Sequence, residues 1–198
     1  MLTKTQIAIM EVFAGSITKS FSIHQISKAL KKPYPLIHRS IQPLLADQFL
    51  KKDEHKYLSL DYRHNLSELA YIESSRKETL FKQHAVIKSL FQDMFKEGDE
   101  AFFILLVFGS VVAGKKKPND IDMLLILDDN KKVDRQEKLL QKVASRFHTK
   151  FHVHVISKES VYEMLSKRDQ LNVMNETLNK HVILFGAENY YLLLNNAR

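Results

Sequence analysis

Two short apolar runs of strand length, residues 101–108 and 121–127, limit what this chain can fold into more than any other feature. Each is too short to span a bilayer, and acidic or turn-forming residues flank both. Similar runs follow at residues 151–156 and 181–185, separated by amphipathic helical patterns that include one expected helix from residue 160 to about 179. This alternation predicts an α/β domain over residues 99–198, with a mixed sheet covered by helices.

The first sixty residues follow a different pattern. Helical spacing predicts short helices over residues 3–14, 22–30 and 35–49, and two extended runs around a charged turn at residues 49–60 predict a hairpin. Helices followed by a hairpin in this order resemble the winged helix-turn-helix family, over residues 1–64. The resemblance implies that the third helix enters the major groove of duplex DNA. The residues expected to contact DNA are His38, Arg39 and Gln42 on that helix, and Lys51, Lys52, His55 and Lys56 on or near the wing.

The charge distribution agrees with a nucleic-acid contact in this segment. The chain carries a net charge of +7, and residues 1–64 hold ten Lys and Arg against five Asp and Glu, leaving +5 there and +2 in residues 65–198. A basic segment attracts phosphates. The alternative is that the positive charge serves only solubility. Net charge alone does not distinguish nucleic-acid binding from solubility.

A connecting helix is predicted between these parts. Leu80, Ile87, Phe91 and Met94 fall at helical intervals, and Gly98 is placed to end the helix. The expected organisation is therefore a winged helix-turn-helix domain at 1–64, a connecting helix at 65–98 and an α/β domain at 99–198.

The segment between the first two apolar runs carries the chemistry. It contains Gly109-Ser110, then Gly114, then Asp120-x-Asp122 at the start of the second run. This arrangement resembles the signature of the DNA polymerase β-like nucleotidyltransferase superfamily, and it is closest to the minimal nucleotidyltransferase branch. The resemblance implies nucleotide binding by Gly109, Ser110, Gly114 and Lys115, and metal binding by Asp120 and Asp122.

The spacing of these residues has a physical reason. Two aspartates two positions apart on a strand point to one face of a sheet, where their oxygens suit Mg²⁺ or Mn²⁺ together with the phosphates of a nucleoside triphosphate. A Gly-Ser turn that opens a short helix lets backbone N–H groups approach the phosphates. Lys115, Lys116 and Lys117 add positive charge beside them. Metal and amides together stabilise charge on the α-phosphate and on the leaving pyrophosphate.

The third carboxylate that active members of this superfamily usually carry is not found. The strand expected to bear it, residues 151–156, offers His152 and His154 on the face opposite Phe151, Val153 and Val155. A histidine there can serve as a general base or as a ligand for a softer metal such as Mn²⁺. The alternative is that both histidines are ordinary half-exposed strand residues with no role in a site.

Two functions follow from these observations. The first is a metal-dependent nucleotidyltransferase that moves a nucleoside monophosphate from a triphosphate to an acceptor; the resemblance implies an antibiotic hydroxyl, an RNA end or a protein side chain, including a tyrosine of a partner toxin. The second is a DNA-binding regulator or antitoxin-like protein with an inactive or nucleotide-sensing transferase domain, and a homodimer suits a two-fold DNA site. The absence of cysteine and of an apolar N-terminal run leads us to expect a cytoplasmic protein without a membrane partner.

Overall fold

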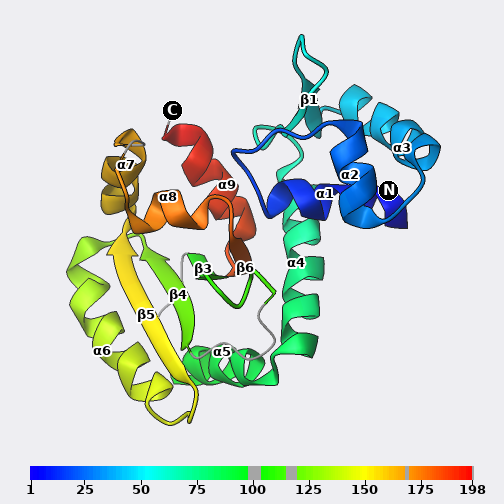
Figure 1. Ribbon diagram of the computed structural model, residues 1–198. Coiled ribbons are helices and arrows are strands. Elements are labelled where there is room, and N and C mark those ends of the chain that lie inside the picture. The colour runs from blue at the N-terminus through cyan, green and yellow to red at the C-terminus, as the bar shows by residue number, and fades with distance from the viewer. Residues whose placement is uncertain (98–103, 115–119, 168–169, 198) are drawn as a thin grey trace.

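The computed structural model describes residues 1–97, 104–114, 120–167 and 170–197, and it is a mixed helix and sheet protein (Figure 1). The N-terminal part is helical and ends in a hairpin; its elements are α1 (Lys4–Ala14), α2 (Ile23–Leu30), α3 (Tyr34–Ala46), β1 (Leu50–Lys52) and β2 (Leu58–Leu60). Thr3 and Ser22 begin α1 and α2 with capping boxes, because each hydroxyl accepts from the backbone N–H three residues later. Phe21 forms an isolated antiparallel bridge with Leu58, which ties the segment before α2 to the hairpin.

The C-terminal part is built on a mixed sheet, as the alternating pattern predicts. Its strands are β3 (Ile104–Phe108), β4 (Asp120–Leu127), β5 (Lys150–Ser157) and β6 (His181–Phe185), in the order β5–β4–β3–β6. β4 and β5 are parallel, whereas β3 is antiparallel to both β4 and β6. The helical elements of this part are η1 (Asn130–Lys132), α6 (Val133–Ala144), α7 (Lys158–Ser166), α8 (Val173–Thr177) and α9 (Ala187–Asn196).

The two faces of the sheet belong to different hydrophobic clusters, because neighbouring strand residues point to opposite sides. One cluster joins one face to the N-terminal helices, and its members include Phe13, Ile41, Leu69, Leu106 and Leu124. The other packs the opposite face against helices α5 (Ala85–Glu97) and α6, and its members include Ile87, Leu90, Val107, Met123 and Leu140. Residues 1–64 and 99–198 therefore share a core.

The helix expected to run unbroken over residues 66–97 is two helices, and that prediction is wrong. α4 (Leu66–Gln83) ends at His84, whose backbone is not helical (φ −136°, ψ 78°), and α5 begins at the next residue. A straight helix of that length would extend about 48 Å in one direction. The bend lets α4 pack against α1, α9 and β6 while α5 crosses beneath the sheet (Figure 1).

The single helix expected from residue 160 to about 179 is also divided. Ser157 begins α7 by accepting a hydrogen bond from the Ser160 N–H, and Asn172 begins α8 in the same way with Asn175. The Asn172 side chain also donates to the Met164 carbonyl, so it holds the start of α8 against the end of α7.

A buried charge network holds α4 to the edge of the sheet. The Glu73 carboxylate is 1% exposed and lies 2.6 Å from Nη1 of Arg76, one turn later on the same helix. The Arg76 guanidinium donates to the carbonyl of His181, and Glu73 accepts from the Ile183 N–H at 3.4 Å and from the Tyr191 hydroxyl at 2.9 Å. This pair supplies hydrogen-bond partners to β6, whose outer edge has no neighbouring strand among the described residues.

Within the part of the chain that the structure describes, no helix combines the length and the apolar character needed to cross a membrane.

Candidate functional site

Two aspartates and a histidine meet where β4 begins. Asp120 and Asp122 lie on one face of β4, as the strand period predicts, and Asp122 pairs in register with His152 on β5. The His152 Nδ1 atom is 3.3 Å from Asp122 Oδ1 and 3.8 Å from Asp120 Oδ2. Both carboxylates therefore approach one imidazole nitrogen. Their side chains are 44% and 26% exposed for Asp120 and Asp122, so this cluster is open to a ligand.

Gly109 forms a bend that presses the backbone against Asp122. Phe108, the last residue of β3, pairs with Asp122, and Gly109 follows with φ +76°. A Cβ atom at Gly109 would lie only 2.6 Å from Asp122 Oδ2. A side chain here would meet both an unfavourable backbone conformation and a steric clash, so the close approach of bend and carboxylate requires glycine.

The turn after this bend is a single hydrogen-bonded helical turn rather than the short helix that we expected. The Ala113 N–H donates to the Gly109 carbonyl at 3.2 Å, and the Gly114 N–H donates to the Val111 carbonyl at 3.3 Å. Val111 is buried and fixes the turn to the sheet, while Ser110 is half-buried within it. The predicted contacts of Lys115, and the charges of residues 116–117, lie outside the described residues.

The structure separates the two histidines of β5. His152 lies beside the carboxylates, whereas His154 pairs in register with Leu124 and its ring centre is 6.1 Å from that of Phe108. Both point to the face that carries the aspartates, and Phe151, Val153 and Val155 pack into the opposite cluster, as predicted. Of these two histidines, His152 is the one that contacts an aspartate of the cluster.

The carboxylates of Asp120 and Asp122 suit a hard cation that takes most of its ligands from water and phosphate oxygens. Among residues 1–97, 104–114, 120–167 and 170–197, no three His, Cys, Asp or Glu side chains are arranged to enclose a metal ion. Mg²⁺ does not need such a cage, because it is usually bound by one or two carboxylates and completes its shell with water and phosphate oxygens. Asp120 and Asp122 beside a glycine bend supply that minimum set, and His152 is placed to hydrogen-bond Asp122.

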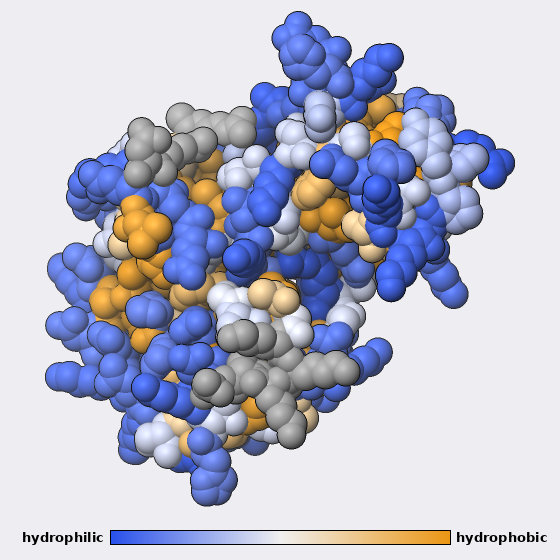
Figure 2. Space-filling view, viewed as in Figure 1, coloured by the Kyte–Doolittle hydropathy of each residue, from blue (hydrophilic) through white to orange (hydrophobic). Residues whose placement is uncertain are grey.

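The residues predicted to contact DNA lie on exposed surface of the N-terminal part, with one exception. His38, Arg39 and Gln42 are exposed on α3, and Lys52 and Lys56 are exposed on the hairpin with His55. Hydrophilic side chains cover the hairpin tip, which projects from the molecule (Figure 2). His38 stacks on the exposed Tyr34, with ring centres 6.1 Å apart.

Lys51 is the exception, because it is only partly exposed and is paired with an acid. Its Nζ atom is 3.3 Å from Oδ1 of Asp61, which the sequence analysis did not single out. Burial raises the pKa of the Asp61 carboxyl, but hydrogen bonds from Arg63 and Lys51 outweigh it and lower the pKa to about 2. Residues 1–64 hold four other acids, so the sequence alone does not distinguish Asp61.

The described residues thus bring together a glycine bend, two carboxylates and one imidazole, and they place a separate set of basic side chains on α3 and the hairpin. Comparison of the chain with protein-family models, with curated proteins and with solved structures finds no match.

Proposed function

We propose that this protein binds a nucleoside triphosphate and a divalent cation beside Gly109 and transfers the nucleoside monophosphate to an acceptor hydroxyl. The observation that carries the proposal is the approach of the Gly109 bend to the Asp122 carboxylate, with Asp120 and His152 at its side. The likeness of this sequence segment to minimal nucleotidyltransferases supports the same chemistry.

Each residue has a role in that reaction. Asp120 and Asp122 would hold Mg²⁺ or Mn²⁺, which supplies positive charge to the phosphate oxygens when bound. Backbone N–H groups at residues 110–112, which precede the two N–H groups that close the turn, would donate to the phosphates. With Nδ1–H donating to Asp122, His152 keeps its Nε2 lone pair and accepts the proton of the acceptor hydroxyl. The hydroxyl oxygen then bonds to the α-phosphorus, and the bond to the leaving pyrophosphate breaks.

The Asp120→Asn, Asp122→Asn double variant tests this proposal. We expect its Mn²⁺-dependent affinity for ATP to fall by about tenfold or more in isothermal titration calorimetry, because the amides neutralise both negative ligands. The matched control is Asp128→Asn, which alters an exposed aspartate directly after the same strand. ATP affinity that is equal in all three proteins would contradict the site, and wild type that releases no pyrophosphate with hydroxyl acceptors would contradict transfer.

A second candidate function is binding of duplex DNA by the N-terminal part, in the manner of a winged helix-turn-helix regulator. What supports it is the set of exposed polar and basic side chains on α3 and on the projecting hairpin, together with the +5 charge of residues 1–64. The order of helices and hairpin, and the bridge from Phe21 to Leu58, are also consistent with that family. In this role α3 lies in the major groove and the hairpin contacts phosphates.

Single alanine variants test this second function. We expect Arg39→Ala and Lys52→Ala each to weaken binding to a mixed-sequence duplex and to reduce the slope of log affinity against log salt by about 1, because each removes one cation that neutralises a DNA phosphate. Lys51→Ala is expected to have a smaller effect, since Lys51 is already paired with Asp61. The control is Lys138→Ala on the exposed face of α6. A salt slope that is unchanged in the Arg39 and Lys52 variants would contradict this placement.

A further inference from the structure

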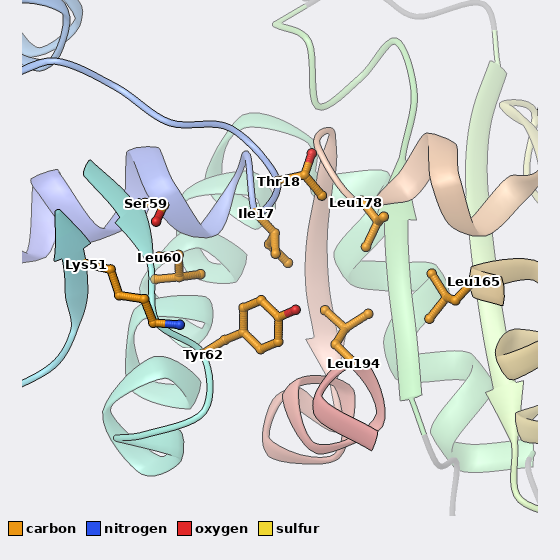
Figure 3. A pocket seen from close by; sticks show the side chains of 9 residues that line it. All are labelled: Ile17, Thr18, Lys51, Ser59, Leu60, Tyr62, Leu165, Leu178 and Leu194. Atoms are coloured by element: carbon orange, nitrogen blue, oxygen red, sulfur yellow. The ribbon is translucent and has the colours of Figure 1, made fainter. Parts of the chain in front are cut away.

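A cavity lies between the hairpin and the C-terminal helices, away from the aspartate cluster (Figure 3). Its volume is about 210 Å³, and the side chains around it come from both the N-terminal and the C-terminal parts of the chain. An apolar cavity of about 150 Å³ is enough to bind benzene in an engineered protein. The present cavity therefore has room for a small organic molecule.

The lining of this cavity is apolar on one side and polar on the other. The apolar side chains are 8% exposed or less; they are Ile17, Leu60, Leu165, Leu178 and Leu194. The polar side chains are Thr18, Lys51, Ser59 and Tyr62. Lys51 and Ser59 pair directly across the hairpin, so their side chains lie on one wall, and Leu165 and Leu178 lie on the far side (Figure 3). Such a lining suits a molecule with one charged or polar end and an apolar tail.

Lys51 gives the polar wall a positive charge, and its ammonium group has more hydrogen-bond donors than Asp61 alone requires. An ammonium group has three N–H donors, and the Lys51 ammonium is paired with Asp61. The Asp61 carboxylate has other partners besides Lys51. Arg63 donates to both of its oxygens, and His64 Nδ1 lies 3.5 Å from Asp61 Oδ2. The Lys51 side chain is 37% exposed, so a ligand can reach it.

The position of the cavity ties its occupancy to the contact between the two parts of the chain. The Ile17 N–H donates to the Leu178 carbonyl at 3.1 Å, and the Thr18 hydroxyl and the Asn179 amide donate to each other's oxygens. These bonds hold the loop after α1 to the end of α8 beside the cavity. A bound molecule would add contacts across the same boundary.

We propose that this cavity binds a small amphipathic carboxylate, with its anionic end on the Lys51 ammonium and its apolar tail among Leu165, Leu178 and Leu194. The carboxylate also reaches the hydroxyl groups of the polar wall, and a tail of five or six carbons matches the available volume. The site is independent of the proposed nucleotide site, and its ligand makes no contact with Asp120 or Asp122.

Hexanoate, hexanol and hexylamine separate the contribution of the head group from that of the tail. In isothermal titration calorimetry with the full chain, we expect hexanoate to bind one to one and about tenfold more tightly than hexanol, because the carboxylate gains a charge-assisted hydrogen bond. Hexylamine is expected to bind most weakly. In a methyl spectrum of leucine-labelled protein, hexanoate should shift Leu165, Leu178 and Leu194.

Two lysine variants on the same strand complete the test. Lys51→Met keeps the length of the side chain and should lower hexanoate affinity to that of hexanol, whereas the control Lys52→Met alters the exposed neighbour and should leave it unchanged. Circular dichroism verifies that both variants are folded. Three results would each overturn the proposal: no saturable binding of hexanoate to wild type, equal binding by the Lys51 variant, or shifts confined to leucines outside the cavity.

Discussion

Replacing Arg76 with methionine is expected to lower the free energy of unfolding by about 3–5 kcal/mol, measured by urea denaturation. Glu73 is 1% exposed, and in the variant its carboxylate keeps the hydrogen bonds from the Tyr191 hydroxyl and the Ile183 N–H but loses its ionic partner. It also removes the donor to the His181 carbonyl at the edge of β6. A buried carboxylate that loses its ionic partner costs far more than a surface ion pair contributes, which is the reason for the size of the effect.

A double variant and a surface control isolate the cause. Glu73→Leu with Arg76→Met removes both charges, so it should recover part of the stability that Arg76→Met alone loses. Arg146→Met makes the same substitution at an exposed pair, in which Arg146 contacts Glu97, and should cost about 1 kcal/mol or less. Equal losses at positions 76 and 146 would show that Glu73 does not depend on Arg76.

Lowering the pH from 7 to 4 is expected to remove about 3 kcal/mol of stability through His181 alone. Its side chain is fully buried, which lowers the pKa of the imidazole to about 3, and the positive charge of Arg76 acts in the same direction. The unfolded chain titrates near pH 6.5 and therefore takes up a proton that the folded chain does not. The stabilisation is fully present above pH 6.5 and is lost progressively as the pH falls toward 3.

The surroundings of His181 explain why it stays neutral. Nδ1 donates to the Thr177 carbonyl at 2.7 Å, and the Tyr190 ring packs against the imidazole with ring centres 5.2 Å apart. The charged groups that face it come from α4: Arg76 hydrogen-bonds its carbonyl, and Glu73 lies 3.9 Å from Nε2 but is already paired with Arg76.

Urea denaturation at pH 7, 5.5 and 4 measures this loss. His181→Asn keeps a side-chain N–H for Thr177 but cannot take up a proton, so its stability should change less between pH 7 and pH 4 than that of wild type. His148→Asn, at an exposed histidine, should retain the wild-type dependence. If the stability of the His181 variant fell with pH as much as that of wild type, groups other than His181 would be responsible for the acid sensitivity.

Much of the local structure could be predicted from the sequence, because periodicity is a property of neighbouring residues. The period of two in residues 120–122 is enough to place both aspartates on one face of a strand, and the same rule places His152 and His154 together. The apolar runs predict the strands of a mixed sheet, and glycine at position 109 predicts a bend. The assignments to winged-helix and nucleotidyltransferase families stay predictions.

The path of residues 66–97 and the surroundings of Lys51 differ from what the local pattern suggests, because packing between distant segments outweighs that pattern. Residues 66–97 have continuous helical spacing, yet the chain bends at His84, because the apolar faces of α4 and α5 have to cover different parts of the molecule. Lys51 has the sequence context of an exposed wing lysine, but the hairpin turns it toward Asp61 and the cavity. Neither outcome is encoded in the few residues on either side.

The sequence by itself determined where helical and extended patterns occur and which side chains share a strand face, since these depend on backbone geometry over a few residues. Only the tertiary structure decided that His152 rather than His154 meets the aspartates, and that the ordinary-looking pair of Glu73 and Arg76 is buried against β6. Strand register and helix burial depend on partners that can be a hundred residues away, and these partners set the environment in which each side chain acts.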